Sequence, residues 1–212
     1  NAMAEPMMVK DRPKVLVEGI YSTEKNCLQL KKIATKQEKV VLYTGKIEER
    51  FGLRDLLDAF IQIKGDEYRL WICGSGETDI VEEFTNKDNR IIYFGTLPRA
   101  RVLNMQQEAT LLVNPRHSNE EFTKYSFPSK TMEYMASGTP TLMCKLDSIP
   151  ESYYEHLFFF DDESVLGMSR RMKELLDSPA EDMFKFGDAA SRFILENKNA
   201  KEQVRRIIEL FN

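Results

Sequence analysis

Short apolar runs recur along most of the chain, and segments with a helical repeat separate them. This alternation predicts βα units and a parallel sheet. The runs are almost continuously apolar, as strands covered by helices on both faces must be. The predicted strands are residues 39–43, 68–73, 90–94, 109–113, 140–144 and 156–160.

Amphipathic helices are predicted between and after these strands. Residues 53–60 place apolar side chains at i, i+3, i+4 and i+7 and so define one buried face. A second such segment covers 165–176, and a longer helical region follows over 180–196. The tail carries a last apolar stripe, made of Val204, Ile207, Ile208 and Phe211. We expect this stripe to pack against another part of the protein.

The first residues lack this pattern. Residues 1–3 are interpreted as a tag remnant, and residues 4–38 as an interdomain linker or N-terminal extension that contains a short strand at 15–17. The main domain is expected over 39–196 and a C-terminal helix over 197–212.

Composition then narrows the class of protein. The 212 residues carry 30 Lys+Arg, 34 Asp+Glu and a net charge of −4. No apolar run approaches the roughly 18 residues of a membrane-spanning helix, and the excess of cations that nucleic acid requires is missing. The three Cys residues show no metal-ligand spacing, which predicts a reducing compartment. We expect a soluble, cytoplasmic protein without a nucleic-acid partner.

The loops at the carboxyl ends of the predicted strands are the candidate sites, because ligands bind there in open parallel sheets. The first loop runs from Gly45 to Gly52. Its glycines let a ligand approach the backbone, and Lys46 and Arg50 place positive charge beside a helix N-terminus, which suits a diphosphate. An ordinary loop with two solvated cations fits this segment equally well.

Two further loops carry weaker signals. Residues 74–76 fail the GxGxxG dinucleotide pattern, because Asp79 stands at the third glycine and a phosphate would be repelled by Glu77 and Asp79. We expect a tight turn and a helix start there, which removes the main support for nicotinamide chemistry. In the loop 95–98, Leu97 could sandwich a nucleobase, although most such loops are only turns.

The most specific segment covers residues 114–140. Arg116, which follows a predicted strand, is a candidate ligand-binding residue. After a polar loop, the segment predicts a short helix that starts at Ser129. Lys130 lies in the first turn, where free N–H groups and the helix dipole attract an anion, so its ammonium would complete a phosphate site. Glu133 projects from nearly the same face and could accept hydrogen bonds from the two ribose hydroxyls. The alternative is a surface ion pair worth about 0.2–0.5 kcal/mol.

The two histidines, His117 and His156, stand beside no Ser or Cys motif and have no second ligand at metal spacing. We expect them to be structural or solvated, and we expect no metal site.

These motifs resemble the C-terminal, donor-binding domain of GT-B glycosyltransferases, specifically the retaining group 1 (family 4) enzymes of the bacterial capsule and surface-polysaccharide type. The most specific part, residues 127–140, is similar to the form FPSK…EYMASGTP. Residues 43–53 are similar to the first glycine loop of the family, and the similarity extends from about Val15 to the C-terminus. The resemblance implies an α/β, Rossmann-like doubly wound parallel sheet, one half of a GT-B fold.

The same resemblance implies a UDP- or GDP-linked sugar as the donor, with no obligatory metal and no other cofactor. By position, Lys46 stands where an Arg contacts the diphosphate, and Glu133 stands at the second Glu of the E-x7-E motif, which binds ribose. Two positions depart from the family pattern. Phe51 occupies the place of a phosphate-binding Lys, and Tyr125 that of the first Glu of E-x7-E, which normally touches the sugar.

Other residues would take over these roles. Arg50 or Lys130 would replace the lost cation, and Ser126 or local backbone groups would contact the sugar. With Lys46 and the helix N-terminus at Ser129, the cations would stabilise the departing diphosphate during transfer with retention. Family members hold a glycan or lipid-linked acceptor in an N-terminal domain that has no counterpart here. We therefore expect half of an enzyme, inactive alone, whose full-length form allows a peripheral contact with the inner face of the membrane.

Three alternatives stay open. A nucleotide-sugar epimerase of GT-B architecture needs carboxylates poised to move a proton or activate water, whereas the candidate loops offer only Glu133. A non-catalytic binding or signalling domain with a phosphoacceptor would want an Asp at a strand end, where Lys46 and Arg116 stand. A catalytically inactive nucleotide-sugar-binding relative is compatible with Phe51 and Tyr125.

Overall fold

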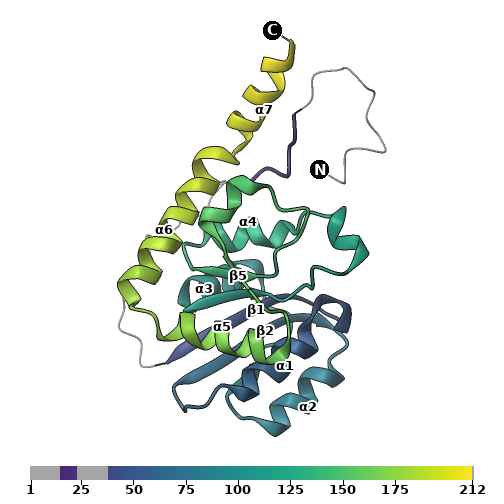
Figure 1. Cartoon of the computed structure of the whole chain (residues 1–212), viewed down its shortest axis with the longest axis vertical. Coiled ribbons are helices and arrows are strands. Elements are labelled where there is room, and N and C mark those ends of the chain that lie inside the picture. Colours follow the sequence, from purple (N-terminus) through teal and green to yellow (C-terminus); the bar gives the residue numbers. More distant parts are fainter. Residues whose placement is uncertain (1–14, 23–37, 212) are drawn as a thin grey trace.

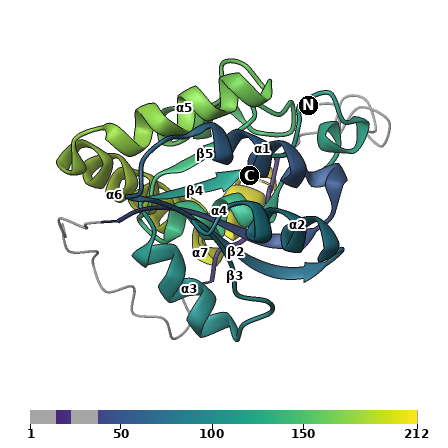
Figure 2. The ribbon, with the colours of Figure 1, turned by 90° about the horizontal axis from the view of Figure 1, so that it is seen from below.

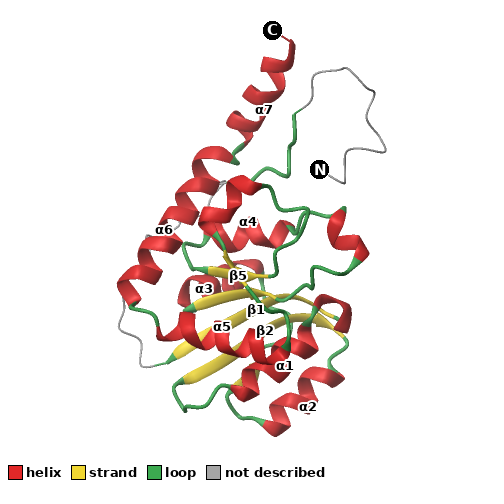
Figure 3. Cartoon of the chain, viewed as in Figure 1, coloured by secondary structure: helices red, strands yellow, loops and turns green. Residues whose placement is uncertain are grey.

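The computed structural model describes residues 15–22 and 38–211. Six parallel strands form one open sheet with the order β3-β2-β1-β4-β5-β6 (Figure 1; Figure 3). The strands are β1 (Lys39–Ile47), β2 (Tyr68–Gly76), β3 (Ile91–Tyr93), β4 (Leu111–Asn114), β5 (Thr141–Met143) and β6 (Phe158–Phe159). The chain adds strands on one side of β1 and then, from β4 onward, on the other. The sheet is therefore doubly wound, and all six predicted strands are present.

The ends of β1 and β2 differ from the prediction. The expected glycine loop at Gly45 and the expected tight turn at 74–76 are instead paired strand residues, with Gly45 opposite Gly74 and Ile47 opposite Gly76. A Cβ atom on Gly74 would lie 1.8 Å from the carbonyl oxygen of Gly45. Glycine at these positions therefore permits close pairing of the two backbones, and the prediction of a turn is wrong for that reason.

The described residues contain seven α-helices. They are α1 (Leu53–Gln62), α2 (Asp79–Lys87), α3 (Arg99–Glu108), α4 (Ser129–Ala136), α5 (Val165–Asp177), α6 (Ala180–Asn197) and α7 (Ala200–Ile208). Successive side chains of β1 point to opposite faces of the sheet and so show which helices cover each face. Val41 packs with α1 and α5, whereas Leu42 packs with Met105 of α3 and Tyr134 of α4. Figure 2 shows α1 and α5 on one side of the sheet and α3 on the other.

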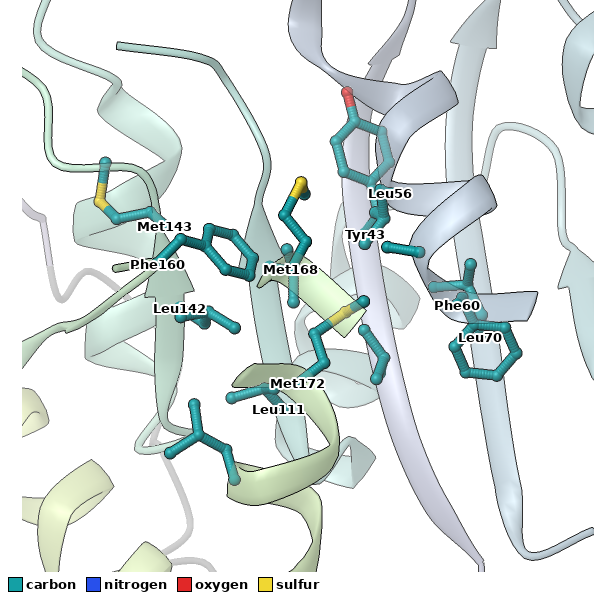
Figure 4. Close-up of a cluster of buried hydrophobic side chains, with 14 of the residues drawn as sticks. Tyr43, Leu56, Phe60, Leu70, Leu111, Leu142, Met143, Phe160, Met168 and Met172 are labelled. Carbon is teal, nitrogen blue, oxygen red and sulfur yellow. The ribbon is translucent and has the colours of Figure 1, made fainter. Parts of the chain in front are cut away.

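The larger core lies under α1 and α5. Met168 and Met172 of α5 lie among side chains of the sheet and of α1, including Leu111, Leu142 and Phe60 (Figure 4). All five side chains are 0% exposed, so this layer is closed to solvent. Burial of this apolar surface supplies the main driving force for folding. It also makes the carboxyl edge of the sheet a firm base for a site.

The N-terminal segment 15–22 forms no strand, so the strand expected at 15–17 is wrong. Its apolar side chains lie largely exposed and outside the sheet. The segment instead joins the end of α6. The backbone N–H of Tyr21 donates to the carbonyl oxygen of Lys198 over 2.8 Å, and Lys198 Nζ lies 3.1 Å from Glu18 Oε1.

The C-terminal helix is present as α7, which runs away from the body of the domain (Figure 1). Its apolar stripe is exposed, up to 83% at Phe211, so no described part of the chain covers it. None of the helices in the described ranges combines the length and apolar character that crossing a membrane requires. Cys73 and Cys144 are buried free thiols. The expected tag remnant at residues 1–3, Cys27 and most of the expected linker lie outside the described residues.

Candidate functional site

The order of the strands reverses between β1 and β4, and the loops that leave these two strands meet at the carboxyl edge. After β1 the chain forms a 3₁₀ turn at Glu49–Phe51 and then passes through Gly52, whose φ is +75°. A Cβ atom on Gly52 would lie 2.0 Å from the carbonyl oxygen of Pro115, which follows β4. Glycine therefore lets the two loops pack directly on each other, at the crevice where ligands bind in such sheets.

The predicted phosphate ligands Lys46 and Arg50 lie together, and both contact Glu48. Lys46 Nζ is 2.5 Å from Glu48 Oε1, and Arg50 Nε donates to Glu48 Oε2 over 2.6 Å. The hydrogen bond from Lys46, supported by Arg50, holds the pKa of Glu48 below its ordinary value. Both cations are mostly exposed, so they remain free to exchange this carboxylate for a ligand. Glu48 was not predicted from the sequence, although it stands between the two cations.

The backbone beneath these cations is held in place by Tyr43. Its hydroxyl donates to the carbonyl oxygen of Lys46 over 2.6 Å, and burial raises its pKa to about 12. A Cβ atom on Gly45 would come within 3.0 Å of the same hydroxyl. The glycine predicted to contact a ligand thus also makes room for the Tyr43 side chain.

Arg116, the last predicted cation of this edge, lies on aromatic rings. Its guanidinium carbon is 4.6 Å from the ring centre of Phe51 and 5.8 Å from that of Phe122, and the two rings meet edge to face. The guanidinium of Arg50 is 4.9 Å from the same Phe51 ring. Burial lowers the pKa of Arg116. No carboxylate among the described residues pairs with it.

A second cluster surrounds Glu133 on α4. Lys130 Nζ donates to Glu133 Oε1 over 2.8 Å, Gln106 Nε2 donates to the same oxygen over 2.9 Å, and Arg99 approaches Oε2 at 3.3 Å. Only 11% of the Glu133 side chain is exposed. Burial opposes its ionisation, but the hydrogen bonds from Lys130 and Gln106 outweigh burial and hold its pKa below the ordinary value.

The sequence predicts two members of this cluster, which lie on one helix, but not the other two. Lys130 and Glu133 lie together, as their spacing of three residues on one helix face predicts. Arg99 and Gln106 come from α3, and no spacing in the sequence connects them with α4. The side chain beside Glu133, Tyr134, hydrogen-bonds Thr44 and so connects α4 to the end of β1.

The remaining predicted residues lie around these two clusters. Leu97 is half-buried against the core on the α3 side of the sheet. Ser129 is exposed and begins α4. Ser126 is also exposed, and its carbonyl oxygen accepts a hydrogen bond from Ser148 Oγ over 3.2 Å. Tyr125, which stands at a departure from the family pattern, is 48% exposed.

His117 belongs to a polar cluster that the sequence did not indicate. Its Nε2 is 2.6 Å from Asp55 Oδ2, and its Nδ1 is 3.2 Å from Glu163 Oε2, which also accepts from the backbone N–H of Ser118. Ligand atoms of His117, Cys144 and Glu163 lie within 4.8 Å of one another, so these residues could hold a metal ion. His117 was expected to have no second ligand at metal spacing, but the fold brings Cys144 and Glu163 beside it from the segments that follow β5 and β6. The two carboxylates already engage both ring nitrogens, which accounts for the cluster without an ion.

The other histidine, His156, has a packing role. Its ring stacks on Phe193 with 4.5 Å between the centroids. Burial lowers its pKa, and its Nδ1 atom is buried without a hydrogen-bond partner among the described residues. These features fit the structural role expected from the sequence.

An open parallel sheet with cations and a hydrogen-bonded carboxylate at its strand-order reversal defines a Rossmann-like domain, one half of the GT-B fold. The family model described as Glycosyl transferases group 1 matches residues 38–178. The chain therefore belongs to this family of glycosyltransferases. No curated protein sequence matches the chain significantly.

Several solved structures are similar to the chain in fold. TarM, a protein of S. aureus, has a TM-score of 0.68 and 15% identity over 87% of this chain and 37% of its own. Anabaena HepE in complex with UDP and glucose has a TM-score of 0.66 and 15% identity over 82% of this chain and 48% of its own. The C-terminal domain of LpcC, a group 1 family glycosyl transferase from Francisella tularensis, has a TM-score of 0.64 and 14% identity over 82% of this chain and 98% of that domain. The chain thus spans less than half the length of TarM and HepE.

Proposed function

We propose that the chain is the nucleotide-diphospho-sugar-binding half of a retaining, family 4 glycosyltransferase that extends a polysaccharide or another glycan. Residues 39–196 would form the donor-binding domain. The observation that carries the proposal is the cluster of Lys130, Gln106 and Arg99 around Glu133, on the helix that Tyr134 connects to the end of β1. A carboxylate for two ribose hydroxyls and cations for a diphosphate are the groups that a nucleotide-diphospho-sugar requires.

The state of Glu133 favours sugar transfer over epimerisation. Its pKa lies below the ordinary value, so the carboxylate stays ionised and accepts hydrogen bonds. A general base that moves a proton at neutral pH needs a pKa near 7. On donor binding, the ribose hydroxyls would replace Lys130 as hydrogen-bond donors to Glu133. Lys130 would then turn to the diphosphate.

The chemistry expected of the site is stabilisation of the leaving group. As the bond to the anomeric carbon breaks, negative charge builds on the diphosphate. Lys46, Arg50, Lys130 and the α4 N-terminus at Ser129 would meet that charge, so we propose that side-chain cations replace a metal ion. Ser126 would contact the sugar and Leu97 the nucleobase. HepE, which has the same fold, is known in complex with UDP and glucose, which supports a UDP-sugar donor.

A second domain would hold the acceptor, a glycan or a lipid-linked sugar. The support is that this chain covers only 37% of TarM and 48% of HepE. The uncovered stripe of α7 would pack partly on that domain. We place the enzyme in the bacterial cytoplasm, at the inner face of the membrane, because its described cysteines are free thiols and nucleotide sugars are its expected donors.

Isothermal calorimetry with UDP, GDP, ADP and CMP tests the proposal. We expect UDP or GDP to bind best, and Lys130→Ala to weaken that affinity about tenfold, which corresponds to about 1.4 kcal/mol. Glu133→Gln should weaken the binding of UDP more than the binding of 2′,3′-dideoxy-UDP, which lacks both ribose hydroxyls. Lys185→Ala, at an exposed ion pair on α6, is the matched control. If folded protein binds none of these nucleotides at millimolar concentration, or if Lys130→Ala binds like the control, the proposal fails.

A further inference from the structure

Arg116 differs from every other described arginine. The others each have an ion pair or a hydrogen bond, including the well-buried Arg90, which bonds Asp88 and the carbonyl oxygen of Ile63. Arg116 has neither among the described residues. Arg116 is half-buried, so its guanidinium loses part of its hydration without a protein acceptor in return. An arginine in this condition indicates an anion that is supplied from outside the chain.

The rings beneath Arg116 fix its position but leave its hydrogen-bonding capacity unused. The guanidinium carbon lies 4.6 Å from the ring centre of Phe51 and 5.8 Å from that of Phe122, and aromatic rings do not use up the N–H donors of an arginine. Packing against two rings also reduces the rotamer freedom that would be lost when a ligand binds. The side chain is therefore prearranged for a bidentate acceptor such as a phosphate.

The surroundings of Arg116 have an excess of positive charge. Arg50 contacts the same Phe51 ring and disfavours the charge of Arg116 by repulsion. Lys46 lies beside Arg50, and Glu48 is the carboxylate that the two share. Three cations against one carboxylate leave a site suited to an anion that carries at least two negative charges, as a diphosphate does.

We propose that Arg116 binds the diphosphate of the donor through the edge of its guanidinium, with Phe51 and Phe122 as the aromatic surface that holds the side chain. The inference rests on the proposed function and adds a specific binding residue to it. It also gives Phe51 a role. Phe51 itself carries no charge, but it orients a cation that comes from the end of β4.

Calorimetry with UDP and UMP on the whole chain tests this assignment. Arg116→Ala should lose about tenfold or more in UDP affinity, and much less in UMP affinity, so that the preference for UDP over UMP collapses. Arg116→Lys keeps the charge but not the bidentate edge, and Phe51→Leu removes part of the aromatic surface. Both should give intermediate losses. Arg192→Ala, an exposed arginine on α6, is the matched control.

The outcomes separate this inference from the proposed function. If the wild type binds neither UDP nor GDP, the proposed function fails and the inference fails with it. If the wild type binds UDP and Arg116→Ala binds like Arg192→Ala, only the inference is overturned. Equal losses for UDP and UMP also overturn it, because the terminal phosphate would then not be the group that Arg116 recognises. Thermal melting checks that the variants are folded. If Arg116→Ala does not fold, Arg116→Lys is compared with Arg192→Ala in its place.

Discussion

The hydroxyl of Tyr134 forms hydrogen bonds with both backbone groups of Thr44. It accepts from the Thr44 N–H over 2.8 Å and donates to the Thr44 carbonyl oxygen over 2.9 Å, and both residues are buried. Burial raises the pKa of Tyr134, so the hydroxyl keeps its proton. Thr44 immediately precedes the cation-bearing end of β1, and Tyr134 immediately follows Glu133. This contact therefore sets the distance between the two halves of the site.

Tyr134→Phe should lower the free energy of unfolding by about 1–3 kcal/mol, because it leaves a buried N–H and a buried carbonyl without their partner. Urea unfolding measures the change. Tyr154→Phe is the control, since that hydroxyl makes no hydrogen bond among the described residues and its ring contact with Phe159 survives. Equal effects of the two substitutions would contradict the importance of the Tyr134 contact.

The buried ion pair between Lys198 and Glu18 predicts a larger loss. Their side chains are only 6% and 4% exposed. Lys198→Met should cost about 3–5 kcal/mol, because it leaves the Glu18 carboxylate buried and unpaired. The exposed pair of Lys185 with Glu181 is the control, and Lys185→Ala should change stability by less than about 1 kcal/mol. A Lys198→Met cost as small as the control's would show that segment 15–22 releases Glu18 to water.

Two glycines with positive φ angles give a matched pair of alanine substitutions. Gly138, at φ +77°, has open space where a Cβ would stand, so Gly138→Ala should cost only the backbone strain of about 1–2 kcal/mol. Gly52→Ala should cost clearly more, because its Cβ would collide with the backbone of Pro115. It should also weaken UDP binding, as the two loops of the crevice are forced apart. Similar melting temperatures for the two variants would contradict this account.

The lowered pKa of Glu133 predicts a pH dependence of stability. Because its pKa is lower in the folded protein than the usual 4.5, its contribution is fully present above about pH 4.5 and is lost as the pH falls through the folded value. The stability advantage of the wild type over Glu133→Gln should therefore shrink between pH 6 and pH 3. Urea unfolding at several pH values measures it. An advantage that does not change with pH would show that the ionised carboxylate is not what the cluster stabilises.

Glu48 competes with a ligand for Lys46 and Arg50. Glu48→Gln should therefore strengthen UDP binding by about two- to fivefold, in line with the free energy of exposed ion pairs. Glu49→Gln is the control, because its partner Arg54 lies on α1 and not among the three cations of the crevice. Calorimetry with both variants checks this. A weaker affinity after Glu48→Gln would mean that Glu48 positions the cations for the ligand.

The strands and helices were predictable wherever the signal lies within a single segment of the sequence. The repeat of 53–60 marks α1, and Ser129 marks the start of α4, because periodicity and helix-start residues are local signals. The ends of β1 and β2 were not predictable, because a glycine considered without its neighbours in space predicts a turn. Only the neighbouring backbone shows that Gly45 and Gly74 pair.

The site divides in the same way. Lys130 and Glu133 were predictable from their spacing on one helix, whereas Gln106 approaches Glu133 from another helix and is recognised only in the fold. Arg116 was a candidate from its place after a strand. Its contact with Phe51 was not foreseeable, because the two residues meet only through the packing of two loops.

The meeting of the strand ends at one edge has an evolutionary consequence. Any of several loops can deliver a charge to the same point in space, so a cation lost from one loop can be regained from another while the sheet is unchanged. On the role proposed for Arg116, Phe51 and Arg116 would be such an exchange, in which the loop after β1 gives up a charge and the loop after β4 provides one. Comparison of relatives by aligned position alone would count this as a loss, whereas comparison by location in the fold would count it as a transfer.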